Sequence, residues 1–450
     1  MSQTQTIAIV LAAGMGTRMK SDTPKVMHRL AGLPLVDHAL AGLKVAGVDQ
    51  AIVVMGPEMA DQADRFAPHK TVVQTDRLGT GHAVRVALEA SETGEADLLV
   101  VFGDTPLLTP DTIKALLACR QEGAAAAVLG FRPSEPGVYG RLITEGEQVC
   151  RIVEAADASP DELAVGLCNS GVLVADGKKL KTWVQALKND NAKGEYYLTD
   201  VIALAQADDG ACVFAEGDVD ELIGINTRAD LAMAEGILQN RYRAAAMAGG
   251  VTLIDPASTF LSHDTTFGTD IEIGPFTVFG PGVTVGNHVT IKGFCHFENA
   301  TIGERATVGP YARLRVGAAL ETDAHVGNFV EIKNARIEEG AKVNHLTYIG
   351  DARVGKAANV GAGTITANYD GFNKSHTDIG AGASIGSNTV LVAPVAVGDG
   401  AITGAGSVVR KDVPDNAIAV TDAAQKNREG TADAYRAQRK AVKESKSKDS

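Results

Sequence analysis

A glycine-rich turn near the amino terminus carries the first residues that could do chemistry. The apolar run "IAIV" (Ile7 to Val10) leads directly into "LAAGMGTRM" (Leu11 to Met19). Backbone N–H groups in such a turn can face a phosphate, and Thr17, Arg18 and Lys25 add donors and positive charge. These cations suit a reaction that concentrates several phosphate charges. The segment therefore predicts a phosphate site at the end of a strand.

Two familiar phosphate loops do not fit this turn. A dinucleotide-binding fingerprint needs a third glycine at position 19, where the chain has Met19, and the Gly-Lys-Ser/Thr of a Walker loop is absent. The formal net charge of −13 argues against a general nucleic-acid binder, because neutralising a nucleic-acid backbone needs clustered cations. A phosphorylated substrate must therefore meet a local basic site.

Alternating strands and helices are needed to position this turn. The strand-like runs are residues 7–11, 51–55, 71–74 and 97–102, and the helix-like stretches between them include 34–46 and 81–90. This alternation predicts an open, mostly parallel sheet with helices on both faces, which binds ligands at the carboxyl ends of its strands. Residues 229–248 are Ala-rich and free of proline, and their apolar residues have helical spacing, so they predict a long linking helix.

The second half of the chain has a different period, because an aliphatic or aromatic residue recurs at every sixth position. The residues predicted to point inward are Leu261, Phe267, Ile273, Phe279, Val285, Ile291, Phe297, Ile302, Val308, Leu314, Leu320, Val326, Ile332, Ile337, Val354, Ile379, Ile385, Leu391, Val397, Ile402 and Val408. Hexapeptide repeats are typical of a parallel β-helix, whose stacked coils bury a continuous apolar column. The register is lost at Thr366 to His376, which predicts a loop on the binding face or, alternatively, a tolerated surface loop.

Bulk composition fits a protein of two or three domains in a reducing compartment. The chain has 450 residues, of which 45% are hydrophobic, and five scattered cysteines without a CxxC or metal-binding spacing. The amino terminus lacks a basic segment before its apolar run, and no apolar stretch approaches the roughly 20 residues that span a bilayer. We expect a cytoplasmic protein without an export signal or membrane anchor.

The glycine-rich turn, together with Pro24-Lys25, resembles the signature of sugar-1-phosphate nucleotidylyltransferases. The segments that match this family in order are "QTDRLGTGHA", "FGDTP", "YGR", Glu154, "NSG", "GEYYLTD" and "GIN". In the second half, "YARLRVGA", "HVGNFVEIKNA", "NHLTYIGDA" and "NVGAGTITANYDG" also match. Over about residues 5–420 the chain resembles the bacterial bifunctional N-acetylglucosamine-1-phosphate uridylyltransferase/glucosamine-1-phosphate N-acetyltransferases.

The resemblance implies a uridylyl-transfer site in the first half. The nucleotide would be held by Leu11, Ala12, Ala13, Gly14, Lys25, Gln74, Gly79, Thr80 and Gly103, the sugar by Gly140, Glu154 and Asn169, and Mg²⁺ by Asp104 and Asn226. With Arg18 and Lys25, a hard cation offsets the repulsion when a sugar phosphate attacks the α-phosphate of UTP. Plainer alternatives are Asp104 as a turn residue or helix N-cap, Arg18 as a surface ion pair, and Gly79-Thr80 as an ordinary helix start.

The resemblance also implies an acetyl-transfer site in the second half, with His345 as general base. The amino sugar phosphate would be surrounded by Arg315, Lys333, Tyr348, Asn359, Asn368 and Tyr369, with Lys374 as a further phosphate partner, and acetyl-CoA would lie along Ala362, Ser387 and Ala405. An amine near neutral pH is mostly ammonium, and an imidazole can take up the proton that it must lose before it attacks a thioester. The alternative is that His345 is a polar residue on the face of the β-helix.

Three positions depart from the family pattern. Met15 stands where many relatives carry Lys, and Phe102 replaces a common Tyr. Asp422 stands where relatives carry an Arg that contacts the coenzyme, and Lys426 or Arg428 are candidate replacements. The charged segment after Arg436 predicts a tail outside the core, part of it helical.

The predicted fold class is α/β: a Rossmann-like nucleotidylyltransferase domain joined by a long helix to a left-handed parallel β-helix of hexapeptide repeats. The expected domains are residues 1–228, the linker 229–249, and 250–450 with the tail. The predicted function is synthesis of UDP-N-acetylglucosamine, a precursor of bacterial wall polysaccharide, by a homotrimer that uses acetyl-CoA, UTP and Mg²⁺. The alternatives are a nucleotidylyltransferase whose β-helix serves only assembly or regulation, and a scaffold that binds nucleotide sugars without catalysis.

Overall fold

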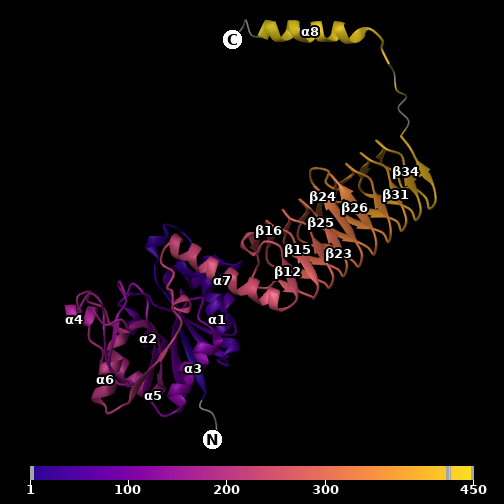
Figure 1. The fold of residues 1–450 in the computed structure, drawn as a ribbon. Helices are drawn as coiled ribbons and strands as arrows, with labels where there is room; N and C mark the ends of the chain where they lie inside the picture. Colours follow the sequence, from indigo (N-terminus) through magenta and orange to yellow (C-terminus); the bar gives the residue numbers. More distant parts are fainter. Residues whose placement is uncertain (1–4, 422–424, 426, 447–450) are drawn as a thin grey trace. The chain divides into compact units, whose positions relative to one another are not determined.

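The structure, a computed structural model, describes residues 5–421, 425 and 427–446 (Figure 1). It divides into two compact units. The first contains Met1–Thr266 and Val278–Gly282, and the second contains Phe267–Thr277 and Val283–Ser450. No helix among the described residues is both long and apolar enough to cross a membrane.

A nine-stranded sheet in the order β5-β4-β1-β6-β10-β7-β11-β9-β8 forms the centre of the first unit. Its strands are β1 Thr6–Ala12, β4 Gln50–Met55, β5 Lys70–Val73, β6 Asp97–Phe102, β7 Ala126–Phe131, β8 Arg141–Glu145, β9 Gln148–Val153, β10 Cys168–Asp176 and β11 Cys212–Glu216. The first four are parallel, as predicted, and β10 is antiparallel to both β6 and β7. Because β1 lies between β4 and β6, the strand order reverses at β1, and the turn after β1 opens at this switch point.

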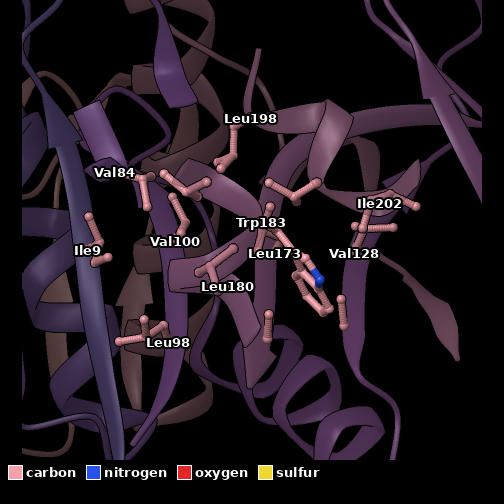
Figure 2. Packing of buried hydrophobic residues seen from close by; sticks show 14 of the residues in the cluster. Ile9, Val84, Leu98, Val100, Val128, Leu173, Leu180, Trp183, Leu198 and Ile202 are labelled. Carbon is pink, nitrogen blue, oxygen red and sulfur yellow. The ribbon is translucent and has the colours of Figure 1, made fainter. Parts of the chain in front are cut away.

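Helices cover both faces of this sheet, as the alternating pattern predicts. The main helices are α1 Leu35–Val45, α2 Thr80–Glu89, α3 Pro110–Gln121, α5 Gly177–Ala186 and α6 Val201–Ala207. Along β1, Ile7, Ile9 and Leu11 enter the core that contains Val84 of α2 and Trp183 of α5 (Figure 2). Ala8, Val10 and Ala12 enter the other core, with residues of α1 and α3. Because alternate side chains of β1 are buried on opposite faces of the sheet, the strand is held from both sides up to the point where the glycine-rich turn begins.

The linking helix is confirmed as α7, Arg228–Ala248. Its amino end is closed by a capping box in which Thr227 and Asp230 bond each other's backbone N–H groups. On its buried face, the Gln239 amide donates to the Leu261 carbonyl over 2.7 Å and accepts from the Leu261 N–H over 2.8 Å. The Gln239 side chain therefore bonds both the N–H and the carbonyl of Leu261, and these two hydrogen bonds hold α7 against the first coil of the second half.

Short parallel strands in stacked coils make up the second half of the chain, which is a parallel β-helix (Figure 1). One sheet contains β12 Val251–Leu253, β15 Ile271–Ile273, β18 Thr290–Ile291, β21 Thr307–Val308, β24 His325–Asn328, β26 Lys342–His345, β28 Asn359–Val360, β31 Ser384–Ile385, β34 Ile402–Thr403 and β36 Ile418–Ala419. A second, fifteen-stranded sheet includes β22 Arg313–Leu314, β25 Glu331–Ile337, β27 Tyr348–Val354, β29 Ile365–Ala367 and β30 Thr377–Ile379. The interrupted register is a loop between β29 and β30. The predicted helical part of the tail is α8, Thr431–Lys446.

The predicted inward series is buried almost throughout, but its last two members are wrong. Ile402 is 45% exposed and Val408 is half-buried, whereas Thr403 and Val409 are 2% and 6% exposed. The six-residue step from Val397 therefore continues without a shift. Thr403 fills the inward position because its hydroxyl accepts the Gly386 N–H and lies 3.4 Å from the Thr389 hydroxyl.

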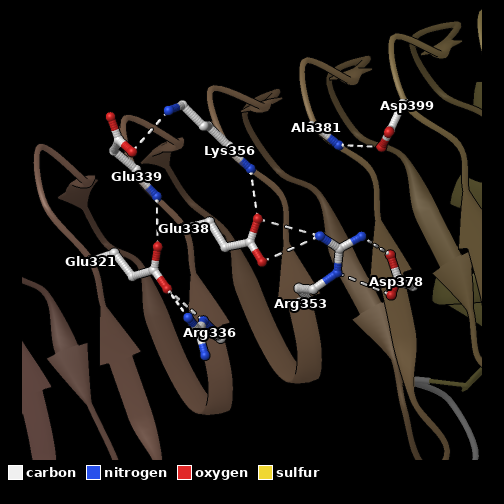
Figure 3. Close-up of polar contacts among 9 residues, drawn as sticks. All are labelled: Glu321, Arg336, Glu338, Glu339, Arg353, Lys356, Asp378, Ala381 and Asp399. Atoms are coloured by element: carbon white, nitrogen blue, oxygen red, sulfur yellow. Dashed lines mark hydrogen bonds and ion pairs between the residues drawn. The ribbon is translucent and has the colours of Figure 1, made fainter.

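Charged side chains link successive coils on the outside of the β-helix (Figure 3). The Arg353 guanidinium lies 2.6 Å from Asp378 and 3.3 Å from Glu338, and Arg336 pairs with Glu321. The hydrogen bond from Arg353 to Asp378 is the largest of the effects that raise the pKa of this guanidinium. Ion pairs thus run along the axis, in addition to the backbone ladder.

Exposed aromatic rings stack along one corner of the β-helix. Phe276, Phe294, Tyr311 and Phe329 lie with successive ring centroids 4.9, 4.9 and 5.0 Å apart. Each has a positive φ between 55° and 61°, so the corner repeats one left-handed turn in each coil. Leu346 (φ 51°) occupies the next corner, and each of the five side chains is 46–64% exposed. We call these five residues the corner column.

Candidate active sites

A cavity of about 270 Å³ opens at the carboxyl ends of β1 and β6. The predicted nucleotide residues that line it are Leu11, Ala13, Gly14, Lys25, Gln74, Gly79, Thr80 and Asp104. Two predicted residues lie behind this lining: Ala12 is buried, and the Gly103 N–H donates to the Leu11 carbonyl over 2.9 Å. The amino end of α2, at Thr80, faces the cavity and presents N–H groups that can bind an anion.

Lys25 joins the two predicted metal ligands. Its ammonium donates to the Asp104 carboxylate and, over 3.1 Å, to the Asn226 side-chain oxygen. The Arg18 guanidinium donates to the same Asn226 oxygen over 3.0 Å. Gly16 (φ 63°) makes room for this arrangement, because an added Cβ would lie 2.5 Å from the Cβ of Lys25. Two oxygens therefore converge on one cationic centre beside the glycine-rich turn.

This donor set fits a magnesium ion. Mg²⁺ prefers oxygen ligands and is held in many enzymes by one or two protein groups, with water and phosphate completing its shell. Among the described residues, no group of three or more His, Cys, Asp or Glu side chains could hold a metal, so a fully protein-coordinated site is not formed there. The Lys25 ammonium shows that the Asp104 and Asn226 oxygens can share one cation.

One plainer interpretation of these residues holds, because Asp104 lies in the turn after β6, whereas the interpretations as a helix N-cap, a surface ion pair and an ordinary helix start do not. Asp104 does not cap α3, because the N-cap is Thr109, whose hydroxyl accepts the Thr112 N–H. Arg18 bonds an amide oxygen in the site rather than a surface carboxylate. Gly79 is a special helix start, since its φ is 106° and an added Cβ would lie 2.6 Å from the Tyr196 carbonyl.

The predicted sugar residues form a group next to this cavity. The Asn169 N–H donates to the Gly140 carbonyl over 2.8 Å, and the Thr199 hydroxyl donates to Glu154 over 3.1 Å. Phe102, which lines the cavity, contacts the backbone at Gly171, where an added Cβ would lie 2.6 Å from the ring. Burial, and then the charge of Glu154, raise the pKa of the neighbouring Asp200 carboxyl. The sugar residues therefore adjoin the nucleotide cavity in a partly buried acidic environment.

In the β-helix, the predicted base and coenzyme residues stand in a single column. Asn328 and His345 are partners in the parallel register of β24 and β26. Gly363, Asn388 and Gly406 directly follow Ala362, Ser387 and Ala405. Each donates its backbone N–H to a carbonyl on the coil below, which belongs to His345, Ala362 and Ser387, respectively. His345, Ala362, Ser387 and Ala405 therefore occupy equivalent positions in successive coils. We call this set, with Asn328 at its foot, the base column.

The predicted phosphate residues lie on the next side of the β-helix. Arg315 stands one coil below Lys333, because its N–H donates to the Ile332 carbonyl. Lys374, from the loop after β29, is the chief neighbour of Lys333, and its proximity and charge lower the pKa of the Lys333 ammonium. Three cations thus gather on this side, with Glu331 paired to Arg315 and Asp351 near the two lysines, and a concentration of positive charge of this kind suits a phosphate group.

Carboxylates hold Arg315 and Asn368 in place. Arg315 donates to Glu331 over 2.7 Å, and this hydrogen bond raises the pKa of the guanidinium. Partial burial opposes ionisation of Asp351, but hydrogen bonds from Asn334 and Asn368, together with the charges of Lys374 and Lys333, lower the pKa of this carboxyl. Asn368 is thereby fixed at the base of the loop.

The corner column separates the two halves of the predicted acetyl site. Phe329 and Leu346 directly follow Asn328 and His345, and the strands that carry the phosphate residues begin after this corner. No hydrogen bond or ion pair joins His345 to Arg315 or Lys333 in the part of the chain that the structure describes. Tyr348 lines an open groove of about 390 Å³ together with Tyr311, Phe329 and Leu346. Asn359, on β28, lies on the side of the base column and pairs in register with Lys342.

Several residues at these sites were not singled out from the sequence. Arg77 lines the nucleotide cavity, pairs with Glu58, and donates from Nε to the Ala13 carbonyl over 2.7 Å. The side-chain oxygen of Asn328, the register partner of His345, lies 2.7 Å from Nδ1 of that imidazole. Both lie inside segments that resemble the family, so their positions were visible but their contacts were not. Asp422 and Lys426 lie outside the described residues.

Comparisons with known proteins agree with both halves. A family model described as a MobA-like NTP transferase domain matches residues 8–166. "Bifunctional protein GlmU" of Paramagnetospirillum magneticum is 54% identical over 448 residues, which cover 99% of this chain and 100% of the relative. The proteins of the same name from Azorhizobium caulinodans and Rhodospirillum rubrum are 52% and 55% identical, covering 98% and 96% of this chain and 99% and 98% of their own length. Identity at this level along almost the whole chain shows that it belongs to the family of bifunctional GlmU proteins, which join an acetyltransferase and a uridylyltransferase in one polypeptide.

Proposed function

We propose that the β-helix transfers an acetyl group from acetyl-CoA to glucosamine-1-phosphate, and that the first unit couples the N-acetylglucosamine-1-phosphate to UTP. The products are UDP-N-acetylglucosamine and pyrophosphate. The observation that carries the second reaction is the convergence of Asp104 and Asn226 oxygens on one cation beside the glycine-rich turn. We assign the reactions to residues 1–228 and 250–450, joined by 229–249, in a protein of the cytoplasm.

Uridylyl transfer brings two anions together, and the residues of the first cavity offset this repulsion. Backbone amides after β1 and at the start of α2 hold the triphosphate, while Lys25 and Arg18 face its charge. Asp104 and Asn226 would hold Mg²⁺, which supplies further neutralisation of phosphate charge when bound. The sugar phosphate oxygen attacks the α-phosphorus, the bond to the β-phosphate oxygen breaks, and pyrophosphate leaves, so no covalent nucleophile is needed.

Acetyl transfer needs a free amine next to a thioester. His345 takes the proton that the amine loses, the nitrogen attacks the thioester carbonyl, and the carbon–sulfur bond breaks to release CoA. Arg315, Lys333 and Lys374 supply three positive charges for the sugar phosphate. The coenzyme lies along Ala362, Ser387 and Ala405, where small side chains leave room beside the backbone.

A homotrimer would complete the acetyl site. In one chain the corner column stands between the base column and the phosphate residues, and its five apolar side chains are 46–64% exposed. A contiguous exposed apolar strip of this kind marks an interaction surface. If it packs against a neighbouring copy, the base column of one chain faces the phosphate residues of the next. Closed symmetry then gives one site at each interface.

Two assays test the proposal on the purified chain. Release of free thiol from acetyl-CoA with glucosamine-1-phosphate reports acetylation, and release of pyrophosphate from UTP with N-acetylglucosamine-1-phosphate reports uridylyl transfer. We expect His345→Ala to abolish only the first and Asp104→Ala only the second. A chain that releases no thiol would have a β-helix for assembly or regulation alone. Full pyrophosphate release by Asp104→Ala would remove the metal assignment.

A further inference from the structure

Asn328 stands directly beneath His345 in the base column. The two residues are register partners in β24 and β26, and Asn328 Oδ1 lies 2.7 Å from His345 Nδ1. Gly327 brings the two strands together, because an added Cβ at this position would lie 2.0 Å from the Asn344 carbonyl oxygen. The backbone therefore holds the carboxamide against one particular ring nitrogen.

We propose that Asn328 is a positioning residue for acetyl transfer, which holds Nδ1 of His345 in its protonated form and thereby leaves the lone pair on Nε2 for the substrate amine. The inference rests on the proposed role of His345 as general base. An amide oxygen can only accept, so the imidazole nitrogen that it contacts must carry hydrogen. A neutral imidazole with hydrogen on Nδ1 is a base at Nε2 alone. Asn328 also fixes the plane of the ring.

Few charged groups surround this pair. His325, on β24, is the nearest other imidazole, and burial, followed by the charges of Lys292, Lys342 and His345, lowers its pKa. On the coil above, the uncharged Ala362 occupies the position over His345, and the uncharged Asn359 pairs in register with Lys342. The orientation of His345 is therefore determined by a neutral hydrogen bond rather than by an ion pair.

Two substitutions of Asn328 separate positioning from folding. Asn328→Leu keeps the approximate size but removes the acceptor, and we expect kcat for acetylation to fall about tenfold or more, because general-base catalysis contributes about 10²–10⁴-fold and the ring then populates both tautomers. KM for both substrates should stay within about twofold of wild type. Asn328→Asp keeps an acceptor at the same place, so acetylation should persist. Its carboxylate favours the imidazolium, and the acid limb of the kcat–pH profile should move up by about 1 pH unit.

The matched control is His325→Gln, which removes the neighbouring imidazole and should leave the acid limb in place. Pyrophosphate release, measured on each variant, reports an intact first unit, and unchanged KM values for the acetylation substrates report an intact β-helix. The inference is overturned by Asn328→Leu with wild-type kcat, by Asn328→Asp with an unmoved acid limb or no acetylation at any pH, or by His325→Gln that moves the limb as far. An active His345→Ala would instead remove the proposed base itself, so the two failures are distinguishable.

Discussion

Lys25 and its two partners show how the resting uridylyl site keeps its charges balanced. Asp104 and Asn226 are held by an internal ammonium, and the Lys25 and Asp104 side chains are only 11% and 16% exposed. A divalent cation that binds the same oxygens must displace this ammonium, which is then free to face phosphate. The proposed metal site therefore predicts competition between two cations for one pair of oxygens.

Replacing Lys25 by Met should separate these two roles. We expect Mn²⁺, a paramagnetic substitute for Mg²⁺, to bind the nucleotide-free variant several-fold more tightly, because its competitor is gone. Pyrophosphate release should fall about 100-fold or more, since one phosphate-facing charge is lost. Electron paramagnetic resonance measures the first quantity. Lys20→Met, which removes an exposed cation nearby, should change neither, and unchanged Mn²⁺ affinity in Lys25→Met would contradict the competition.

Arg77 supplies a cation next to a turn that lacks one at Met15. Its hydrogen bond to the Ala13 carbonyl orients the peptide that leads into Gly14. We expect Arg77→Met to raise KM for UTP about tenfold, as a hydrogen bond to a charged group is worth about 1.5–3 kcal/mol. Initial rates of pyrophosphate release at varied UTP measure this, with Arg77→Lys restoring part of the loss. Arg65→Met, which breaks an ion pair with Asp37, is the control, and an equal effect there would argue against a specific role.

The identities of many site residues could be predicted, whereas their contacts could not. Segments that resemble a family indicate Lys25, Asp104 and His345 because those residue types are what the chemistry requires. Arg77 meets Ala13 across 64 residues, and Asn328 meets His345 across one coil of 17 residues. Such pairs exist only after the sheet order and the coil length are fixed, so a local pattern does not contain them.

At the scale of the element, the hexapeptide period predicted the β-helix and failed first at Ile402, where a polar residue takes the inward position, and the same shift of one residue then made Val408 wrong. Thr403 was overlooked because an inward position was expected to be apolar, and Ile402 was chosen instead. The error shows that a coil accepts a polar side chain inside when a backbone N–H on the coil below needs a partner, as Gly386 does. Periodicity predicts the position, and the hydrogen-bond requirement selects the residue.

Thr403→Val should therefore destabilise the β-helix although it makes the column more apolar. The Gly386 N–H loses its acceptor, at a cost of about 1–2 kcal/mol. We expect faster hydrogen exchange at the Gly386 amide and a lower denaturant midpoint by circular dichroism, with Thr403→Ser close to wild type. Wild-type exchange at Gly386 in the Val variant would show that water replaces the hydroxyl.

At the scale of the whole molecule, the base column and the phosphate residues that are predicted to form the acetyl site lie on different sides of one corner. No hydrogen bond or ion pair joins His345 to Arg315 or Lys333 among the described residues, whereas all the residues that line the nucleotide cavity belong to the first unit. We therefore expect acetylation to depend on assembly and uridylyl transfer to be independent of it. Dilution until the assembly dissociates should lower only thiol release.

Mixed assemblies test this expectation without dilution. His345→Ala and Lys333→Ala should each be inactive in acetylation when expressed alone. Co-expressed in equal amounts, they should recover about a quarter of wild-type activity, because in a closed ring that fraction of interfaces joins an intact base column to intact phosphate residues. Recovery is measured as thiol release per chain. A mixture as inactive as its components would place both groups of one site in the same chain.

The base column also has a regular spacing along the axis of the β-helix, with one residue on each coil. Each coil advances the chain by about 4.8 Å, so His345 and Ala405 are three coils apart, or roughly 14 Å. A span of this kind suits an extended ligand that lies parallel to the axis, with its reactive end at His345 and the rest of its length in contact with one small residue on each coil. Removing a whole coil between His345 and Ser387 would preserve the stacking of the remaining coils yet shorten the distance from His345 to Ala405 by one coil. We therefore expect the hydrogen-bond spacing of the polypeptide backbone, which no single substitution can change, to set the length of ligand that this column accepts.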